Sequence, residues 1–416
     1  MNKLNKLNKS IFAVLLISIM ALTGCGNGVS DEGAGIQPVP ELVGTPIEEV
    51  VEAPAQEVAE ETDAAKEDAQ EAEAAAEEVQ EETATEEEVI PPNSYRSELT
   101  GQWIDESLMN QRPIAVMVDN EVYALGHYGV NSADIVYEMM NSTANGRITR
   151  LMCIVKDYAA LTRFGSVRST RPTNFMVAAE YNAILIHDGG PYYNDEYYAK
   201  DYVNNFSGGF ARFSNGKATE FTEYVTWENY YNAEKGKNYD GLSTRLKNSK
   251  YDIEYNSYYP GKHFNFCETE DYTLSNTAAG ATCAQAATLV AFPFPHNGSE
   301  LRYNEELKKY EYYEYGRPHV DPLDNNATTS FKNVIIQDCD FTQLDVNGYM
   351  KYHVVGNGKG YFLTNGEAIP ITWSKASETA LTEFVNAETG DPIDLNIGHT
   401  YIAIVPSDVW GELVLK

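Results

Sequence analysis

The chain has 416 residues, of which 43% are hydrophobic, and it carries a formal charge of −32 at pH 7. This length allows two globular domains with appendages, and the hydrophobic content excludes a chain that is disordered throughout. Because nucleic acids repel an acidic protein, the charge also argues against a DNA or RNA partner.

The N-terminus has the pattern of an export signal. Residues 1–10 contain three lysines, and residues 11–24 form an apolar stretch too short to span a bilayer comfortably. This stretch ends in Leu22-Thr23-Gly24-Cys25, which resembles a bacterial lipobox. The resemblance implies that residues 1–24 are a removed signal peptide and that a lipid on Cys25 anchors the exported protein to the cell membrane. The alternative is an ordinary signal peptide with a chance cysteine.

Most of the negative charge lies in the next segment. Residues 31–90 hold 21 Asp and Glu against one lysine, Lys66. Residues 56–88 have a helix-forming composition, but they lack an apolar stripe and their like charges repel one another. We therefore predict a disordered acidic tether over residues 25–92.

Residues 93–299 alternate between strand and helix patterns. Residues 114–118 and 151–155 are continuous apolar runs typical of buried strands, and residues 183–187 predict a third strand. Residues 175–181 have helical spacing, residues 133–140 fit a helix or a strand, and residues 192–262 form a tyrosine-rich insertion. This alternation predicts an α/β domain.

Residues 300–416 predict a smaller, mostly antiparallel β domain. The pair Asn365-Gly366 lies between two alternating runs and favours a two-residue hairpin, because both residues tolerate the positive φ of a type I′ turn. The predicted strands are residues 333–337, 349–355, 360–364, 368–374, 380–386 and 400–405.

The strongest candidate site lies in residues 165–191. Arg168 and Arg171 are three residues apart, and with the hydroxyl of Ser169 they could present two guanidinium groups to one anion. Pro172 suits the first turn of a helix whose amides would face the same anion. Arg150, at the head of a predicted strand, could join them. The alternative is that these arginines pair structurally with Asp119, Glu138 or Asp188.

Three residues are candidates for acid–base catalysis: Asp119, Glu138 and His187. His187 ends a predicted strand and precedes Asp188, Gly189 and Gly190, which we include among the ligand-binding candidates because glycines let a ligand approach the backbone. The alternative is that His187 is an ordinary hydrogen-bonded histidine.

Neither a metal site nor a cofactor is predicted. The chain shows no Cys/His ligand spacing, no Walker loop and no dinucleotide fingerprint. Cys153 lies in an apolar run and fits a buried position, whereas Cys267 and Cys283 flank a loop and could form a disulfide outside the cell. The pairing of these cysteines and Cys339 stays open.

Several motifs in order resemble the YerB-type lipoproteins, bacterial envelope proteins of unknown function. They are residues 112–120 (RPIAVMVDN), 133–138 (ADIVYE), 148–150 (ITR), 165–172 (GSVRSTRP), 333–337 (NVIIQ), 356–360 (GNGKG) and 371–375 (ITWSK). The resemblance covers most of residues 95–416 and implies a two-domain envelope lipoprotein. It weakens over 192–262, where a His-Asn pair usual in such proteins is replaced by residues 222–227 (TEYVTW).

The leading hypothesis is a membrane-anchored protein that binds an anionic cell-wall or lipid-linked glycan ligand through its arginines. A fold-level likeness to the LytR-CpsA-Psr phosphotransferases, which act on polyprenyl pyrophosphates, keeps a second hypothesis open: a cell-envelope phosphotransferase or hydrolase. The third is a non-catalytic scaffold with salt-bridged arginines and a protein partner on its tyrosine-rich face.

Overall fold

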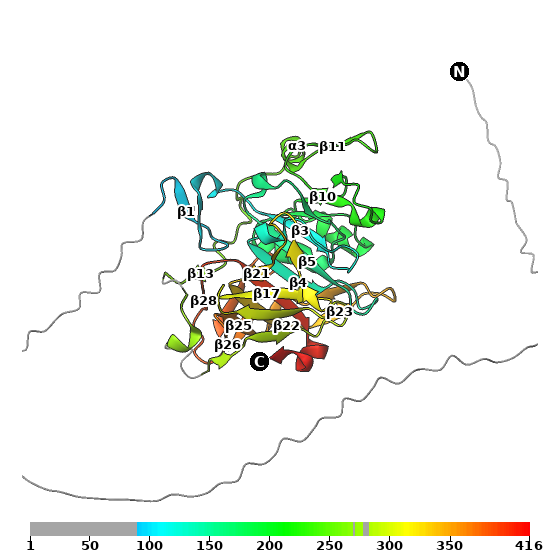
Figure 1. The fold of residues 1–416 in the computed structure, drawn as a ribbon. Helices are drawn as coiled ribbons and strands as arrows, with labels where there is room; N and C mark the ends of the chain where they lie inside the picture. Colours follow the sequence, from blue (N-terminus) through cyan, green and yellow to red (C-terminus); the bar gives the residue numbers. More distant parts are fainter. Residues whose placement is uncertain (1–89, 269–270, 278–282) are drawn as a thin grey trace, which may run out of the picture. The chain divides into compact units, whose positions relative to one another are not determined.

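The computed structural model describes residues 90–268, 271–277 and 283–416, which fold around one large mixed sheet (Figure 1). Within these ranges the larger sheet has eleven strands in the order β14-β26-β25-β22-β29-β4-β5-β3-β7-β8, with β27 paired to β26. Their bounds are β14 Gln285–Ala286, β26 Glu367–Lys375, β25 Gly356–Thr364, β22 Asn333–Cys339, β29 Thr400–Pro406, β4 Ile135–Met140, β5 Thr149–Val155, β3 Ile114–Asp119, β7 Ile184–His187, β8 Asn205–Ser207 and β27 Thr382–Asn386.

Strands from both halves of the chain meet in the middle of this sheet. β29 runs parallel to β22 on one side and parallel to β4 on the other, with Thr400 opposite Asn333 and Ile135. β4, β5 and β3 are antiparallel neighbours, whereas β7 and β8 continue the sheet in parallel. The two predicted globular parts therefore share one hydrogen-bonded sheet.

The described residues also build a second, six-stranded sheet, in which β21 pairs with β17 beside the order β18-β17-β16-β15-β30. Its strands are β15 Leu289–Ala291, β16 Glu300–Asn304, β17 Lys309–Glu314, β18 Arg317–Pro318, β21 Ser330–Phe331 and β30 Val414–Leu415. Smaller sheets pair β1 Ser94–Arg96 with β2 Trp103–Asp105, β6 Phe164–Gly165 and β9 Ala211–Arg212 with β10 Glu223–Val225, β11 Tyr230–Asn232 with β12 Lys237–Tyr239, β13 Asn265–Phe266 with β28 Asp394–Leu395, β19 Val320–Asp321 with β20 Ala327–Thr328, and β23 Phe341–Gln343 with β24 Met350–Tyr352.

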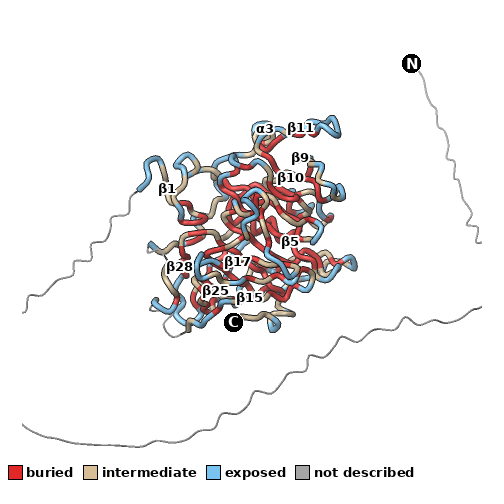
Figure 2. Tube along the Cα trace, in the orientation of Figure 1, coloured by how far each residue is buried: buried red, intermediate tan, exposed pale blue. Residues whose placement is uncertain are grey.

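The central strands are buried on both faces, as Figure 2 shows for β5. Successive residues of β3 divide between two hydrophobic clusters. Val116 belongs to the cluster that includes Leu301 and Tyr310 of the second sheet, and Met117 belongs to the cluster that includes Phe175 of helix α1 (Pro172–Glu180). This burial explains why such strands are continuous apolar runs rather than alternating ones. A sheet therefore covers one face, and α1 contributes to the cover of the other.

The structure confirms the predicted fold class, an α/β part followed by a mostly antiparallel part, although the helices are few and short. α1 corresponds to the expected helix and begins at Pro172; α2 (Asp195–Tyr198) and α3 (Leu242–Asn248) lie in the tyrosine-rich insertion. The ambiguous residues 133–140 form strand β4. The hairpin between β25 and β26 is confirmed, with φ of 48° at Asn365 and 77° at Gly366.

The signal peptide predicted for residues 1–24 and nearly all of the predicted tether lie outside the described residues. Within the described ranges, no helix combines the length and the apolar character that crossing a bilayer requires. Cys153 is buried in the core, as its apolar neighbours predict.

Candidate functional site

The fold brings the predicted arginines together at one edge of the large sheet. Asp119 is the last residue of β3, and the antiparallel register places Arg150 of β5 directly opposite it. The segment after β6 then returns along β3: Val167 bridges Val118, and the backbone N–H of Arg168 donates to the carbonyl of Met117 at 2.9 Å. Arg168 therefore reaches the same strand end as Arg150.

Asp119 is fully buried and engages two of these arginines. Its Oδ2 lies 2.6 Å from Nε of Arg168, and its Oδ1 lies 3.2 Å from Nη1 of Arg150. Oδ1 also accepts a hydrogen bond from the backbone N–H of Glu121 at 3.1 Å. The carboxylate predicted as an acid–base group is thus committed to ion pairs.

Arg171 is the third member of the cluster and precedes α1. Its Nε donates to the carbonyl of Asn141 at 2.9 Å, and its Nη1 donates to the carbonyl of Thr170 at 2.8 Å and to Oγ of Ser169 at 3.2 Å. Its guanidinium lies 4.9 Å from the ring centroid of Tyr349. Among the described residues, no carboxylate forms an ion pair with Arg171.

The cluster carries an excess of positive charge. Burial, reinforced by the nearby guanidinium of Arg150, lowers the pKa of Arg171 to about 10. Burial also lowers the pKa of Arg150, and the positive charge of Arg168 acts in the same direction. Among the described residues, the other carboxylate paired to these arginines is the exposed Glu220, 3.5 Å from Arg168. Three guanidinium groups therefore share one buried and one exposed carboxylate.

The loop after β7 lies along the arginine turn. The backbone N–H of Asp188 donates to the carbonyl of Arg168 at 3.0 Å, and that of Thr170 donates to the carbonyl of Gly189 at 3.2 Å. Gly189 and Gly190 are exposed. A Cβ at Gly190 would collide with Nδ2 of Asn194, so a larger residue there would require the Asn194 side chain to move.

His187 lies behind this loop with both ring nitrogens occupied. Nδ1 is 2.9 Å from the carbonyl of Gly189, and Nε2 is 3.1 Å from Oδ1 of Asn205. The ring stacks on Tyr198, and burial lowers the pKa of His187. This geometry is that of a histidine which supports the loop.

Sequence reasoning named Asp188 as a candidate but missed Glu223, the second carboxylate beside the loop. Nη2 of Arg212 lies 3.0 Å from Oδ2 of Asp188 and also pairs with Glu223 of β10. Burial and a hydrogen bond with Asp188 raise the pKa of Glu223 to about 7. The two acids lie 35 positions apart in the chain, and no local pattern connects them.

Glu138 is buried in the interior and is hydrogen-bonded to residues of both sheets rather than to the arginines. Its Oε1 accepts hydrogen bonds from Asn120, Thr149 and Asn297 at 2.7–3.0 Å, and its Oε2 accepts from Tyr312 at 3.0 Å and from Tyr401. A carboxylate satisfied by so many donors has a structural role in this geometry.

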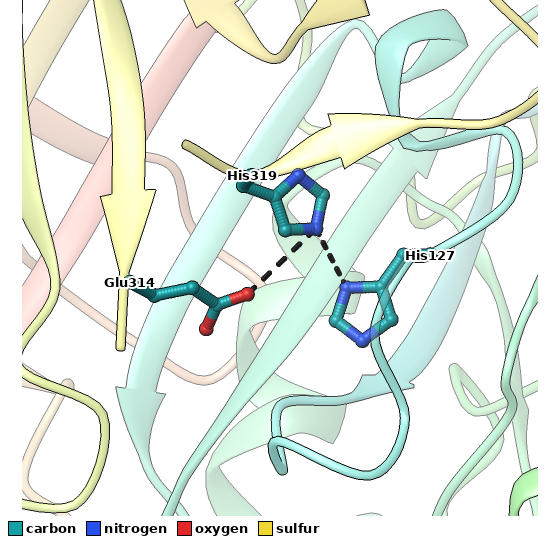
Figure 3. Close-up of side chains that lie close together, drawn as sticks. All are labelled: His127, Glu314 and His319. Atoms are coloured by element: carbon teal, nitrogen blue, oxygen red, sulfur yellow. Dashed lines mark hydrogen bonds and ion pairs between the residues drawn. The ribbon is translucent and has the colours of Figure 1, made fainter. Parts of the chain in front are cut away.

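A second missed cluster consists of His127, Glu314 and His319, all buried (Figure 3). His127 follows β3, whereas Glu314 ends β17 and His319 lies between β18 and β19. Nδ1 of His127 is 2.8 Å from Nε2 of His319. Because 192 residues separate the two histidines, no motif spacing could have found them.

A cavity of about 550 Å³ lies elsewhere: it is lined by residues that include Leu274, Phe362 and Ile393, and not by Arg150, Arg168 or Arg171. Within the arginine cluster, Arg168 keeps 23% of its side chain exposed, whereas Arg150 keeps 5%.

The comparisons with known proteins place this chain in a class of two-domain proteins of unknown function. The chain is a member of the DUF3048 family of proteins of unknown function: the model of the N-terminal domain matches residues 99–240, and that of the C-terminal domain matches residues 290–402. The family assignment confirms the resemblance drawn from the sequence motifs.

Within this class the chain is similar to YerB of Bacillus subtilis (strain 168), a protein named as a proposed lipoprotein. The two are 24% identical over 318 residues, which are 75% of this chain and 86% of YerB. The crystal structure of YerB matches with a TM-score of 0.60 and 18% identity, covering 77% of this chain and 99% of that chain. The structural likeness supports the fold described above.

Proposed function

We propose that this protein is a lipid-anchored lipoprotein on the outer face of the bacterial cell membrane, where it binds an anionic cell-envelope ligand through Arg150, Arg168 and Arg171. The lipobox-like residues ending in Cys25 support the anchor, and so does the lipoprotein name of the relative YerB. The ligand-binding part rests on the arginine cluster.

The observation that carries the proposal is the charge imbalance at the sheet edge. Buried arginines are ordinarily matched by carboxylates, because an unpaired buried charge is costly. Here Arg171 is paired with none among the described residues, and Arg150 and Arg168 share Asp119. An anion seated against Arg168 and Arg171 would supply the missing negative charge.

The surrounding groups fit a phosphate- or carboxylate-bearing ligand. Guanidinium groups donate in pairs to either anion, and such charge-assisted hydrogen bonds are stronger than neutral ones. Ser169 lies between the arginines, and the exposed Gly189 and Gly190 leave the adjoining backbone open to a ligand.

Titration of the full chain in detergent with inorganic pyrophosphate, and separately with citrate, tests this proposal and separates the two ligand chemistries. We expect one of the two anions to bind, and the Arg168→Gln and Arg171→Gln variants to bind it about tenfold to hundredfold more weakly. The exposed Arg302→Gln variant is the matched control and should bind like the wild type. Absence of binding to both anions would leave the arginines with internal structural partners only, as in a scaffold, and would overturn the proposal.

One observation favours a second candidate function, a cell-envelope phosphotransferase or hydrolase. The Asp188–Glu223 pair beside Arg212 contains a carboxyl group with a pKa of about 7, which suits proton transfer near neutral pH. Glu223→Gln should then abolish turnover of a lipid-linked pyrophosphate glycan while leaving pyrophosphate binding intact. A wild-type protein inert on such substrates would count against this function without touching the binding proposal.

A further inference from the structure

We propose that His127, Glu314 and His319 bind one divalent transition-metal ion, with Zn²⁺ as the representative ion. The site is separate from the arginine cluster and does not depend on the ligand proposed for it. Two imidazoles and one carboxylate are a donor set that proteins use for zinc.

The geometry of the three side chains is compatible with one shared ion (Figure 3). Nε2 of His319 lies 2.8 Å from Nδ1 of His127 and 3.8 Å from Oε1 of Glu314, and all three atoms lie within 4.8 Å of one another. Zinc bonds to histidine nitrogen and carboxylate oxygen measure about 2.0–2.2 Å. Small side-chain shifts would therefore place one ion in contact with all three atoms.

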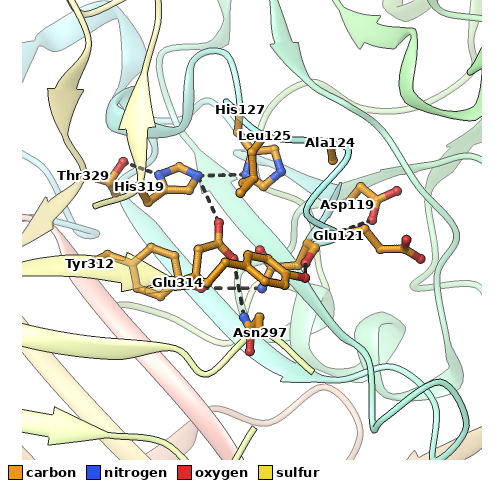
Figure 4. Close-up of polar contacts among 12 residues, drawn as sticks. Asp119, Glu121, Ala124, Leu125, His127, Asn297, Tyr312, Glu314, His319 and Thr329 are labelled. Carbon is orange, nitrogen blue, oxygen red and sulfur yellow. Dashed lines mark hydrogen bonds and ion pairs between the residues drawn. The ribbon is translucent and has the colours of Figure 1, made fainter. Parts of the chain in front are cut away.

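A hydrogen-bonded chain fixes the tautomer of His319. Nδ2 of Asn131 donates to Asp324 at 2.9 Å, so its Oδ1 accepts from the hydroxyl of Thr329 at 2.6 Å. That hydroxyl must then accept from Nδ1–H of His319 at 2.8 Å (Figure 4). The neutral ring consequently presents a lone pair on Nε2, the atom that faces His127 and Glu314. A metal-bound histidine is commonly oriented in this way through its other nitrogen.

The carboxylate of Glu314 supplies the second independent observation. Its Oε1 is buried and has no hydrogen-bond partner among the described residues, and it points toward His319. Such an orphaned buried oxygen is costly unless something unseen satisfies it. Both imidazoles are buried as well, so all three proposed donor side chains lie inside the protein.

The site would tie the two matched family segments together. His127 lies in residues 99–240, and Glu314 and His319 lie in residues 290–402. The backbone already holds His319 in place, because its N–H donates to the carbonyl of Tyr312 at 2.9 Å and its carbonyl accepts from Thr329 at 2.9 Å. A bound ion would therefore stabilise the folded chain in proportion to its affinity.

The experiment measures metal content and Co²⁺ absorption of the full chain in detergent after chelation, reloading and gel filtration. We expect one ion per chain, a Co²⁺ spectrum showing nitrogen and oxygen ligands, and a melting temperature about 5 °C higher at a hundredfold excess of metal over Kd. The Glu314→Gln and His319→Gln variants should bind at least tenfold more weakly. His399→Gln, a histidine outside the cluster, is the matched control and should retain the site.

Two results would overturn the proposal. Wild-type chain that retains neither Zn²⁺ nor Co²⁺ would show that the two histidines simply share a proton. Unchanged Co²⁺ binding in a folded Glu314→Gln variant would place the ion elsewhere. Because the wild-type spectrum needs no variant, the test stands even where a substitution impairs folding.

Discussion

Asp119 and Arg168 form the closest ion pair of the arginine cluster, with Oδ2 of the carboxylate 2.6 Å from Nε of the guanidinium. Asp119 is fully buried and also pairs with Arg150, so one carboxylate at the end of β3 compensates two arginines. Asp119 is therefore the buried carboxylate on which the charge balance at these strand ends depends, beside the exposed Glu220 that also pairs with Arg168.

The Asp119→Asn substitution should destabilise the protein by about 3–5 kcal/mol, because it leaves two guanidinium groups without their buried partner. Urea unfolding of the full chain measures the loss. Phosphate should restore part of the stability of this variant more than that of the wild type, since an anion can take the place of the carboxylate. Asp408→Asn, which breaks the exposed pair with Arg147, should cost within about 1 kcal/mol. A comparable cost for both variants would contradict this account.

Glu138→Gln should cost about 2–4 kcal/mol, because the amide loses the charge that its donors stabilise and turns an N–H₂ group toward some of them. Unfolding by urea again provides the measurement. Glu383→Gln, on the exposed side of β27, is the control and should be nearly neutral. If Glu138→Gln were as mild as the control, Glu138 would not be the centre of the interior network.

The Asp188–Glu223 pair predicts a pH dependence of stability. The folded pKa of Glu223 is raised from 4.5 to about 7, so between these values the folded state holds a proton that the unfolded state has released. The contribution of Glu223 to the free energy of unfolding is therefore fully present below pH 4.5 and is lost as the pH rises to about 7. Above that pH the stability no longer changes through this group. Unfolding measured from pH 5 to pH 8 should show a shallower decline in Glu223→Gln than in the wild type, and identical slopes would refute the assignment.

Cys25→Ser should move the full chain from the membrane fraction to the soluble fraction, because serine lacks the thiol to which the lipid would be attached. Mass spectrometry of the wild type should find an acylated Cys25 as the first residue of the mature protein. A mature N-terminus at another residue, or an unmodified Cys25, would contradict the anchor.

The sequence was informative wherever a feature is local. Residues 114–118 and 151–155 predicted buried strands because strands covered on both faces lack polar positions, and Asn365-Gly366 predicted its hairpin from turn chemistry. The Arg168–Arg171 turn was recognisable for the same reason. Asp119 was also recognisable as a site candidate, because it is a charged residue directly after the apolar run of a predicted strand.

Features that depend on distant parts of the chain could not be predicted. The parallel pairing of β29 with β4 joins residues more than 260 positions apart, as Ile135 and Thr400 illustrate. The donors of Glu138 include Asn297 and Tyr401, and the buried cluster joins His127 to His319. Periodicity and motif spacing report neighbours along the chain, so they are silent about groups that only tertiary folding brings together.

The most direct test of the anion-binding account is a crystal structure of the full chain with bound pyrophosphate, or with citrate if that anion binds more tightly. The account predicts electron density for the anion in contact with the guanidinium groups of Arg168 and Arg171, beside Ser169. Density confined to other sites, with both guanidinium groups still occupied by internal partners, would contradict it.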